Sequence, residues 1–502
     1  MDSLTQFFAY FSPFGGTFTK SSTKSKKEEQ FKQQNFRRGE GGQNGAVPPG
    51  RGGEMAVDKA KLVAKRATML SSKCQTFYAD DPLLVARASM QFVFDENGRR
   101  FLDCISNVQH VGHCHPRVVE AVHSQLSLST CNIRFLSPIL TDLAESLLQT
   151  FPSQLDTVLF CNSGSEANDL ALQLARDWTG AKDVIVLENA YHGHLTTAMQ
   201  MSPYKFDRGS NIKQPKWVHV GPAPDLYRGK YRHADEDFGD KSELSRKYVE
   251  DIRRILERAK AKGRRVAAFI AEALQSCGGQ VLPPRGYFRQ VAEVVRAHGG
   301  VVIVDEVQTG FGRVGDTFWA HQLDGEDGEF VPDIVTMGKS MGNGYPIAAV
   351  VTCKEIADKH CGAVSYFNTY GGNPASCAAA LSVLRVIREE NLLGHCQNMG
   401  ELFRKELNGL KERHKSVGDV RGAGMFWGVD LVKSRCTREP NSELAHKLIL
   451  KLKREDGVLL SIDGPYGNIL KFKPPLCFGV TDLREAINAL DKALGELSND
   501  DV

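Results

Sequence analysis

Lys339 follows a short apolar run and precedes a glycine-rich turn, in the stretch PDIVTMGKSMGNGYP of residues 332–346. Four to six apolar residues bounded by turn signals are typical of a buried strand. A lysine at the carboxyl end of such a strand loses hydration, which disfavours its charged form. A neutral amine in that place can form a Schiff base with an aldehyde. Taken alone, the same spacing also suits an ordinary lysine in a surface loop.

A helix start with anion-binding features lies at residues 160–168, FCNSGSEAN. The pattern predicts a strand, a glycine turn and a helix, in which Ser163 or Gly164 is the N-cap and Glu166 reaches back as in a capping box. Free backbone amides, a small residue and hydroxyl groups at a helix N-terminus suit a phosphate group. The segment lacks the glycine spacing of the common nucleotide-binding loops. A well-capped helix without a ligand is the alternative.

Two acids end a third apolar run, VVIVDEVQTGFG of residues 301–312. Asp305 and Glu306 follow β-branched residues, and open α/β sheets bind ligands at the carboxyl ends of their strands. A solvated strand end is the alternative, because acids usually stay exposed.

The stretches NVQHVGHCHP and YHGH are rich in histidine, but they lack the ligand spacing of zinc sites. We therefore predict no metal site.

These residue types converge on one chemistry. A strand-end lysine, a phosphate site at a helix start, a strand-end acid and an aromatic side chain suit a phosphorylated ring that contains a basic nitrogen. Pyridoxal 5′-phosphate is such a molecule, and an acid that keeps its ring nitrogen protonated makes the ring an electron sink. We therefore predict a pyridoxal-phosphate site.

The composition of the chain argues against two classes of partner. Its 502 residues carry a formal net charge of +3, without the clustered basic residues of a nucleic-acid surface. No apolar run reaches the roughly 18 residues that would suggest a membrane span. The 12 cysteines include no Cys-x-x-Cys pair, and most sit inside apolar runs, as Cys161, Cys277 and Cys353 do. This pattern predicts reduced core thiols in an intracellular protein.

From about residue 80 the chain alternates short apolar strands with helical patterns, which indicates parallel βαβ units and a sheet covered on both faces. Towards the C-terminus, amphipathic helices mix with shorter strands. We therefore predict an α/β protein with four segments: a disordered leader at 1–54, an N-terminal segment at 55–125 that belongs to the small lobe, a large cofactor-binding domain at 126–388, and a C-terminal small α+β domain at 389–498.

The predicted leader is rich in Gly, Gln, Lys and Arg, and its nearly complete lack of aliphatic residues argues against folding. Its first part, LTQFFAYFSPFGG, is aromatic and hydroxylated, as in a mitochondrial leader, whereas the pair Glu28 and Glu29 fits that class poorly. We predict a mitochondrial location, with the cytoplasm as the alternative.

Six motifs between about Phe77 and Phe478 resemble, in their order, the class-III aminotransferase family. They are SGSEAN, YHGH, DEVQTGFGR, GKSMGNG, TYGGNP and RGAG. The resemblance implies the fold of type I pyridoxal-phosphate enzymes, with a large, mostly parallel sheet domain and a smaller α+β domain. It also implies a homodimer with its active sites at the subunit interface.

The resemblance implies roles at the cofactor's ring. Lys339 would bind the cofactor's aldehyde and serve as the catalytic base. Asp305 would pair with the ring nitrogen, Gln308 would lie near the ring hydroxyl, and Tyr191 would stack on the ring.

It further implies roles around the phosphate and the substrate. Gly164 and Ser165 would hold the cofactor's phosphate, and Thr369 would reach that phosphate from the partner subunit. Glu272 and Arg421 match residues that manage substrate carboxylates, and Glu272 would also border the cofactor.

Lys339 by itself does not fix the reaction. The carbanion formed by proton removal can be reprotonated on the cofactor, which is transamination, or it can expel a leaving group from the next carbon. The stretches SNVQHVGHCHP, SPYKF, YRGKYR, SCGGQ, YFNTYGGNP and DGPYGNILKFKPP resemble the phospho-lyase branch of the family. Its members split O-phosphoethanolamine or 5-phosphohydroxy-L-lysine into an aldehyde, ammonia and phosphate. We therefore predict a phospho-lyase that acts on a small-molecule amine.

Two of these stretches supply candidates for binding the substrate's phosphate, namely Tyr204, Lys205 and Arg228. For each of them a solvated basic loop is the alternative. The chain departs from the branch at Tyr345, Ile133 and Ser137, where the branch usually has histidine, serine and histidine. If those positions line the entrance to the site, the substrate differs.

Two other functions remain open at this point. An aminotransferase that uses an ω-amine or alanine with a keto acid is favoured by Arg421 and Glu272. A non-catalytic family member that binds the cofactor or a partner protein is disfavoured, because a binding module has no use for Lys339.

Overall fold

The computed structural model describes residues 58–232, 241–324 and 330–499. The predicted disordered leader at 1–54 lies outside the described residues. Every helix and strand below belongs to one compact unit, Lys59–Val502. Within the described residues, the helices are all too short or too polar to cross a membrane.

A seven-stranded sheet forms the centre of this unit, in the order β4-β10-β9-β8-β7-β5-β6. Its strands are β4 (Thr157–Cys161), β5 (Asp183–Leu187), β6 (Val218–Gly221), β7 (Val266–Glu272), β8 (Val301–Asp305), β9 (Ile334–Met337) and β10 (Ala348–Thr352). Strands β6, β5, β7, β8 and β9 are parallel, whereas β10 runs antiparallel to both β9 and β4. The predicted mostly parallel sheet is therefore confirmed.

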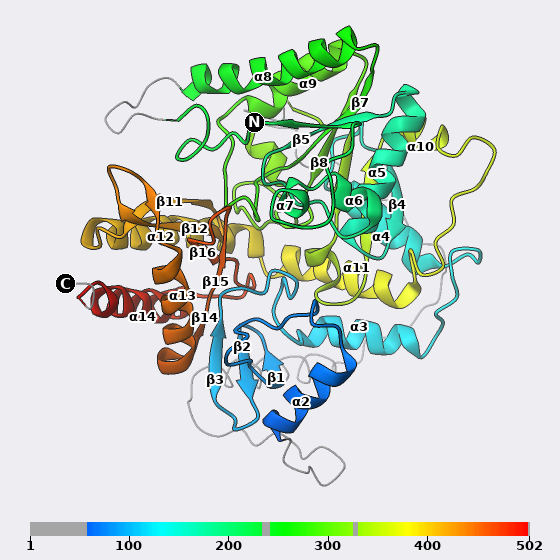
Figure 1. Ribbon diagram of the computed structural model, residues 1–502. Coiled ribbons are helices and arrows are strands. Elements are labelled where there is room, and N and C mark those ends of the chain that lie inside the picture. The colour runs from blue at the N-terminus through cyan, green and yellow to red at the C-terminus, as the bar shows by residue number, and fades with distance from the viewer. Residues whose placement is uncertain (1–57, 233–240, 325–329, 500–502) are drawn as a thin grey trace, which may run out of the picture. The chain divides into compact units, whose positions relative to one another are not determined.

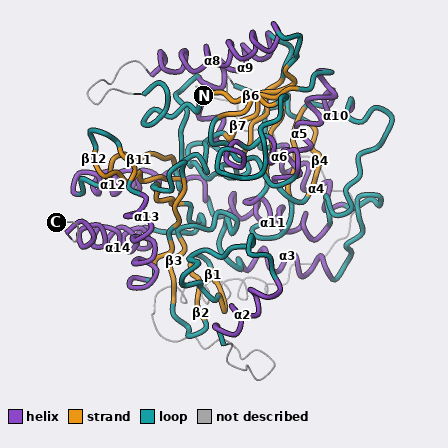
Figure 2. Tube along the Cα trace, viewed as in Figure 1, coloured by secondary structure: helices purple, strands orange, loops and turns teal. Residues whose placement is uncertain are grey.

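Helices cover both faces of this sheet, because successive strand residues point to opposite sides. Val184 and Val186 pack in one cluster with residues of α5 (Gly164–Thr179), whereas Ile185 and Leu187 pack with α8 (Lys241–Ala261) and α9 (Tyr287–Ala297). Figure 1 shows α8 and α9 at the top of the view and α5 at the right, and Figure 2 shows the strands between these purple helices. Strands buried on both faces explain the continuous apolar runs of the sequence.

Two smaller sheets complete the unit. One contains β1 (Val85–Ser89), β2 (Phe92–Asp95), β3 (Arg100–Asp103) and β14 (Val458–Leu459), and the other contains β11 (Val417–Ala423), β12 (Phe426–Ser434), β13 (Glu439–Pro440), β15 (Ser461–Asp463) and β16 (Ile469–Phe472). Val458 pairs in parallel with Leu102, so residues from both ends of the chain share one sheet. The boundaries predicted at residues 125 and 388 stay a prediction.

The remaining helices connect and cover these sheets. They are α2 (Lys59–Met69), α3 (Pro116–Leu126), α4 (Pro138–Leu148), α6 (Thr196–Gln200), α7 (Pro203–Phe206), α10 (Lys354–Asp358), α11 (Pro374–Glu389), α12 (Leu392–Arg413), α13 (Ser442–Lys451) and α14 (Val480–Asn499). The long helix expected after TYGGNP is α11, which Asn373 caps by accepting a hydrogen bond from the Ala375 amide. Most side chains of α11 are buried, so this helix lies inside the unit.

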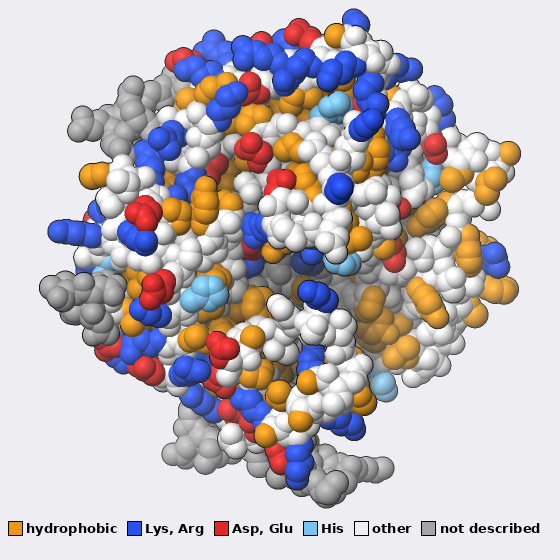
Figure 3. Space-filling view, in the orientation of Figure 1, with side chains coloured by type: hydrophobic (Ala, Val, Ile, Leu, Met, Phe, Trp, Pro, Cys, Tyr) orange, Lys and Arg blue, Asp and Glu red, His pale blue; other side chains and the backbone are white. Residues whose placement is uncertain are grey.

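Basic side chains gather over α8, at the top of the space-filling view (Figure 3). Acids of the same helix pair with several of them: Lys247 lies 2.8 Å from Glu243, and Arg254 lies 3.3 Å from Glu250. This surface is therefore a solvated helix face of mixed charge.

The cysteine prediction needs a correction. All 12 thiols are unpaired, but only Cys104, Cys161, Cys377 and Cys396 are buried, and Cys277, Cys353 and Cys477 are half-buried. The others near the surface lie in loops and turns, where apolar neighbours in the sequence do not imply burial.

Candidate active site

A cavity of about 310 Å³ lies at the edge of the central sheet where its parallel strands end. Strand β7 ends at Glu272, β8 ends at Asp305, and β9 ends two residues before Lys339. Seven of the predicted cofactor-binding residues line this cavity, namely Gly164, Ser165, Tyr191, Glu272, Asp305, Gln308 and Lys339. Parallel strands carry their carboxyl ends to one edge, so segments far apart in the sequence meet there.

Small residues allow the segment before Lys339 to lie against the helix start. A Cβ atom on Gly338 would lie 3.0 Å from the Gly164 nitrogen, and a Cβ atom on Gly164 would lie 2.7 Å from Val307 Cγ1. Larger residues at either position would push the three segments apart. The two glycines therefore bring Lys339 close to the N-terminus of α5.

The N-terminus of α5 has the predicted capping arrangement in a modified form. Ser163 Oγ accepts a hydrogen bond from the Glu166 amide at 3.2 Å. Glu166 Oε2 accepts from the amide of Asn162 at 2.7 Å, one residue earlier than a capping box requires. Ser163, Gly164 and Ser165 all line the cavity, so backbone amides and two hydroxyls are available to an anion there.

Asp305 is held by two side chains that the sequence did not single out. Its Oδ2 accepts hydrogen bonds from Asn168 Nδ2 at 2.7 Å and from His192 Nδ1 at 2.9 Å. The amide of Asn168 is itself fixed, because its Oδ1 accepts from the Thr336 hydroxyl at 2.6 Å. These contacts leave Oδ1 of Asp305, which accepts from the Val307 amide, as the oxygen with acceptor capacity for a cation.

Asn168 and His192 lie inside SGSEAN and YHGH, so the motifs contained a signal. Their roles could not be read from it, because each contact joins strands and helices far apart in the sequence.

The neighbouring acid, Glu306, does not line the cavity. It is buried and accepts from His321 Nδ1 at 2.8 Å, so it is a structural acid.

Glu272 is a second buried carboxyl group beside Asp305. The two residues are paired across β7 and β8. Burial, and next the negative charge of Asp305, raise the pKa of Glu272 from 4.5 to about 7. Its oxygens accept from the amides of Tyr191 at 3.2 Å and Ser276 at 3.0 Å, which offsets part of this effect.

Glu272→Gln should therefore change how the stability of the ligand-free chain depends on pH. The folded state binds more protons than the unfolded state between pH 4.5 and about 7, because the pKa of Glu272 is raised on folding. As the pH rises through this window, the wild type should lose about 3 kcal/mol of unfolding free energy relative to Glu272→Gln. Urea unfolding of both proteins from pH 5 to pH 8 measures the difference. A difference that does not change with pH would show that Glu272 ionises normally.

Gln308 is fixed at the side of the cavity by two donors. Its Oε1 accepts from Asn107 Nδ2 at 3.1 Å and from Lys473 Nζ at 2.6 Å. With the oxygen occupied, the amide nitrogen is free to donate to a ligand oxygen in the cavity.

The candidates for the substrate's phosphate lie in different surroundings. Tyr204 packs edge-on against Tyr191 with ring centroids 5.5 Å apart, and Lys205 Nζ lies 5.4 Å from the centre of the Tyr191 ring. Arg228 donates to both oxygens of Asp430, at 2.8 and 2.6 Å. Tyr204 and Lys205 thus adjoin a residue of the cavity wall, whereas Arg228 is engaged by a buried acid.

Arg421 shares this acid with Arg228. It donates to Asp419 at 2.7 Å, to the carbonyl oxygen of Gly279 at 2.9 Å and to Asp430 at 3.3 Å. Neither arginine is among the residues that line the cavity. Their predicted substrate-binding roles stay predictions.

Thr369 is exposed and does not line the cavity of its own chain. Its neighbour Asn368 accepts a hydrogen bond from Asn162, a residue of the cavity wall, at 2.9 Å.

Three positions of the sequence depart from the phospho-lyase branch. Of these, Tyr345 lines the cavity, whereas Ile133 and Ser137 do not.

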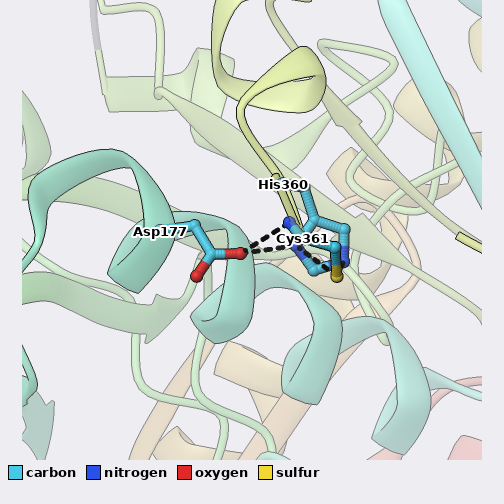
Figure 4. Close-up of side chains that lie close together, drawn as sticks. All are labelled: Asp177, His360 and Cys361. Atoms are coloured by element: carbon cyan, nitrogen blue, oxygen red, sulfur yellow. Dashed lines mark hydrogen bonds and ion pairs between the residues drawn. The ribbon is translucent and has the colours of Figure 1, made fainter. Parts of the chain in front are cut away.

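One group of possible metal ligands occurs in the described part of the chain, formed by Asp177, His360 and Cys361 (Figure 4). The carboxylate of Asp177 accepts from His360 Nδ1 at 2.8 Å. Cys361 Sγ lies at similar distances from both ring nitrogens, 3.6 and 3.1 Å, which places it beside the ring and off the lone-pair axis of either. These contacts describe a local hydrogen-bonded turn.

The histidine-rich stretch has separate structural partners. His110 is buried and contacts the Phe311 carbonyl oxygen at 2.7 Å, and His113 contacts Asp103 at 2.7 Å. These side chains therefore do not share one coordination centre.

The residues of the cavity fit pyridoxal 5′-phosphate on three observations. A lysine lies beside a helix start with free amides, and Gly193 approaches this start so closely that a Cβ atom would lie 2.5 Å from Ser165 Oγ. A buried carboxylate is oriented by Asn168 and His192. When bound, this cofactor stabilises negative charge on the carbon next to the substrate's amine.

Comparisons with known proteins agree with this site. The model of the family "Aminotransferase class-III" matches residues 77–494. The chain is 58% identical over 439 residues to "Ethanolamine-phosphate phospho-lyase homolog 1" of Caenorhabditis elegans, covering 87% of this chain and 93% of the relative. It is 39% identical over 446 residues to "Alanine--glyoxylate aminotransferase 2 homolog 2, mitochondrial" of Arabidopsis thaliana, covering 87% of both.

A solved structure has the same fold. The phospholyase from Arthrobacter in complex with phosphoethanolamine is 36% identical, with a TM-score of 0.81, and covers 86% of this chain and 99% of that chain. The predicted type I fold and the predicted enzyme are confirmed, and the alternative of a non-catalytic family member is set aside. The chain is an enzyme of the class-III aminotransferase family, and its cofactor is pyridoxal 5′-phosphate.

Proposed function

We propose that this enzyme is a phospho-lyase that splits an amino-phosphate into an aldehyde, ammonia and phosphate. One observation carries the proposal: a single cavity holds Lys339, the helix start and Asp305, while Arg421, the predicted partner of a substrate carboxylate, is paired with two acids. The similarity to two proteins named as phospho-lyases supports it. Lys339, Asp305, Gln308, Tyr191 and Ser165 are proposed to hold the cofactor.

Lys339 has the central role in the proposed reaction. Its amine is released when the substrate's amine takes its place, and it then removes a proton from the carbon that carries the substrate's nitrogen. The bond between the neighbouring carbon and the phosphate oxygen breaks, and the electron pair leaves with the phosphate. The neighbouring carbon, now part of a carbon–carbon double bond, takes up a proton, and water then replaces the nitrogen, which gives the aldehyde and ammonia. No electrons are exchanged with a second substrate, so no keto acid is needed.

The ion pairs that Arg421 already forms favour a substrate without a carboxylate. Asp419 and Asp430 lie 2.7 and 3.3 Å from its guanidinium group, and its side chain is only 11% exposed. A carboxylate ligand would have to compete with these two acids for the guanidinium group, and each acid already holds it by an ion pair. O-Phosphoethanolamine has no carboxylate, whereas 5-phosphohydroxy-L-lysine and the keto acids of transamination do. We therefore rank phosphoethanolamine first.

The test of this function is the need for a keto acid. Incubation of the cofactor-loaded enzyme with phosphoethanolamine alone should release equal amounts of phosphate and ammonia over many turnovers. Phosphohydroxylysine serves as the second substrate, and each reaction is repeated with pyruvate or glyoxylate. If neither phosphate ester reacts, but an amine reacts when the keto acid is present, the aminotransferase is the correct assignment.

A homodimer that completes the cofactor site is proposed around Thr369. Large apolar side chains on two loops near it are exposed, among them Phe135 at 65%, Leu136 at 105% and Tyr370 at 69%. The two loops contact each other, because the Arg134 guanidinium lies 3.9 Å from the centre of the Phe367 ring. Exposed apolar surface of this kind is typical of an interface. Both loops lie on the right of the view in Figure 1.

Mixed dimers should show whether Thr369 acts across that interface. Lys339→Ala chains and inactive Thr369→Ala chains should regain part of the activity when they form hybrids, because one of the two sites then has both residues intact. Hybrids are isolated by two different affinity tags. Inactive hybrids would place Thr369 and Lys339 in the site of one chain.

A mitochondrial location remains part of the proposal, with the cytoplasm as the alternative. The Arabidopsis relative carries "mitochondrial" in its name, which supports the first. The sequence features behind the prediction lie outside the described residues.

A further inference from the structure

Lys473 is a buried lysine without an acidic partner. It follows β16 directly, and only 2% of its surface is exposed. Its Nζ donates to Ser276 Oγ and to Gln308 Oε1, both at 2.6 Å. No carboxylate among the described residues forms an ion pair with it.

Two other buried or nearly buried lysines, Lys453 and Lys471, each form an ion pair with an acid. Lys453 lies 2.7 Å from Asp81, and Lys471 lies 2.8 Å from Asp463. Buried charges are normally paired in this way, since an ammonium group without a counter-charge is costly in a low-dielectric interior. Burial, and next the positive charge of Lys471, lower the pKa of Lys473 well below 10.5. Lys473 is thus the exception.

The position of Lys473 explains which ligand could supply the missing charge. Gln308, one of its two acceptors, lines the active-site cavity. The amide of Ser276, the other acceptor, donates to Glu272, which also lines it. The positive charge of Lys339 adds to the lowering of the Lys473 pKa, whereas the negative charge of Asp463, which Lys471 already pairs, acts in the opposite direction. Lys473 therefore lies directly behind the wall of the reaction site.

An ammonium group has three N–H donors, and two are used here. A ligand with several strong acceptor oxygens and negative charge would match the third donor and the unpaired charge. The leaving phosphate of the proposed reaction is such a group. A carboxylate would match the charge as well, but the proposed substrate carries none.

We propose that Lys473 binds the phosphate of the substrate and stabilises it as it leaves. This inference rests on the proposed function for the identity of the ligand. As the carbon–oxygen bond breaks, negative charge grows on the phosphate, and a desolvated cation stabilises that charge more strongly than the smaller charge of the bound ester. The sequence contained Lys473 in the stretch ILKFKPP, yet nothing in the spacing distinguished it from Lys471.

A structural role for Lys473 makes a different prediction. If it served only to orient Gln308, a neutral donor in its place would be sufficient. Lys473→Gln keeps a donor near Gln308 and removes the charge, whereas Lys473→Met removes both. Lys433→Met is the control, because Lys433 lies on β12 of the same sheet with a side chain that is 59% exposed.

The experiment measures binding of inorganic phosphate to the cofactor-loaded proteins by calorimetry. The cofactor's own phosphate occupies its site, so added phosphate reports on a second site. We expect Lys473→Met and Lys473→Gln both to weaken phosphate binding by at least about tenfold, the usual effect of losing a hydrogen bond to a charged group. The KM for phosphoethanolamine should rise and kcat should fall. Lys433→Met should bind phosphate like the wild type.

Two further measurements separate folding from function. The melting temperature of Lys473→Met should not fall, because the change removes an unpaired buried charge. The absorption change on adding ethanolamine, an amine without phosphate, should be the same in wild type and both variants. Unchanged phosphate affinity in the variants, or full rescue by glutamine, would overturn the proposal. Loss of the ethanolamine response in both variants would also overturn it, in favour of a role in holding the cofactor.

The proposed function is judged separately in the same series. A wild type that releases no phosphate from phosphoethanolamine contradicts the phospho-lyase assignment. A wild type that does release phosphate, together with variants that do so equally well, contradicts only the role of Lys473.

Discussion

Lys339→Ala is expected to lower turnover by at least about 10⁴-fold, because the change removes both the proposed attachment of the cofactor and the proposed base that moves the proton. The fold should be retained, since Lys339 is only partly buried and begins a short 3-10 helix, Lys339–Gly342, after β9. Among the described residues that line the cavity, Lys339 is the only lysine, so no other side chain of the wall offers an amine in its place.

Borohydride reduction of the cofactor-loaded wild type, followed by peptide mapping, identifies the attached lysine directly. The pyridoxyl label should be found on residue 339 and should be absent from Lys339→Ala. Lys354→Ala, a change on the exposed surface of α10, is the control and should behave as the wild type does. A label on Lys473, the buried lysine near Lys339, would contradict the assignment.

Asp305→Asn is expected to keep the cofactor and to lose about 100-fold in activity. A carboxylate next to a cation shifts its pKa by 1 to 3 units, so removing the charge lowers the protonated fraction of the cofactor's ring nitrogen by about 100-fold. The surroundings also fix how an amide would lie. Asn168 and His192 both donate to Oδ2, so the amide oxygen must take that place and the NH₂ group must take the place of Oδ1. Such a group cannot accept a proton from the ring.

The absorption spectrum and the turnover number of Asp305→Asn measure this effect. Asp183→Asn is a matched control, because Asp183 is also buried but lies at the start of β5 and pairs with Arg264. Loss of the ion pair between Asp183 and Arg264 should lower the melting temperature and leave turnover of the folded enzyme unchanged. Near wild-type turnover by Asp305→Asn would place its carboxylate away from the ring.

The sequence by itself determined the local parts of the site. Apolar runs followed by Gly164, Asp305 and Lys339 identified strands whose ends carry polar groups, and alternation with helices identified a parallel sheet. Parallel strands present their carboxyl ends at one edge, so these residues could be expected to meet without knowledge of the exact strand order. The sequence was sufficient to predict these strand ends, because a strand and the turn after it are each determined by a few consecutive residues.

The tertiary structure decided which charges have partners. Glu272 lies beside Asp305 only because β7 and β8 pair in that register, and this proximity is one cause of its raised pKa. Arg228 and Arg421 were predicted as ligand-binding residues, yet both are paired with Asp430. The electrostatics of a buried group depend on every charge around it in space, and those charges come from distant parts of the chain. Lys473 shows the same principle, since its missing counter-charge becomes visible only when all of its neighbours are known.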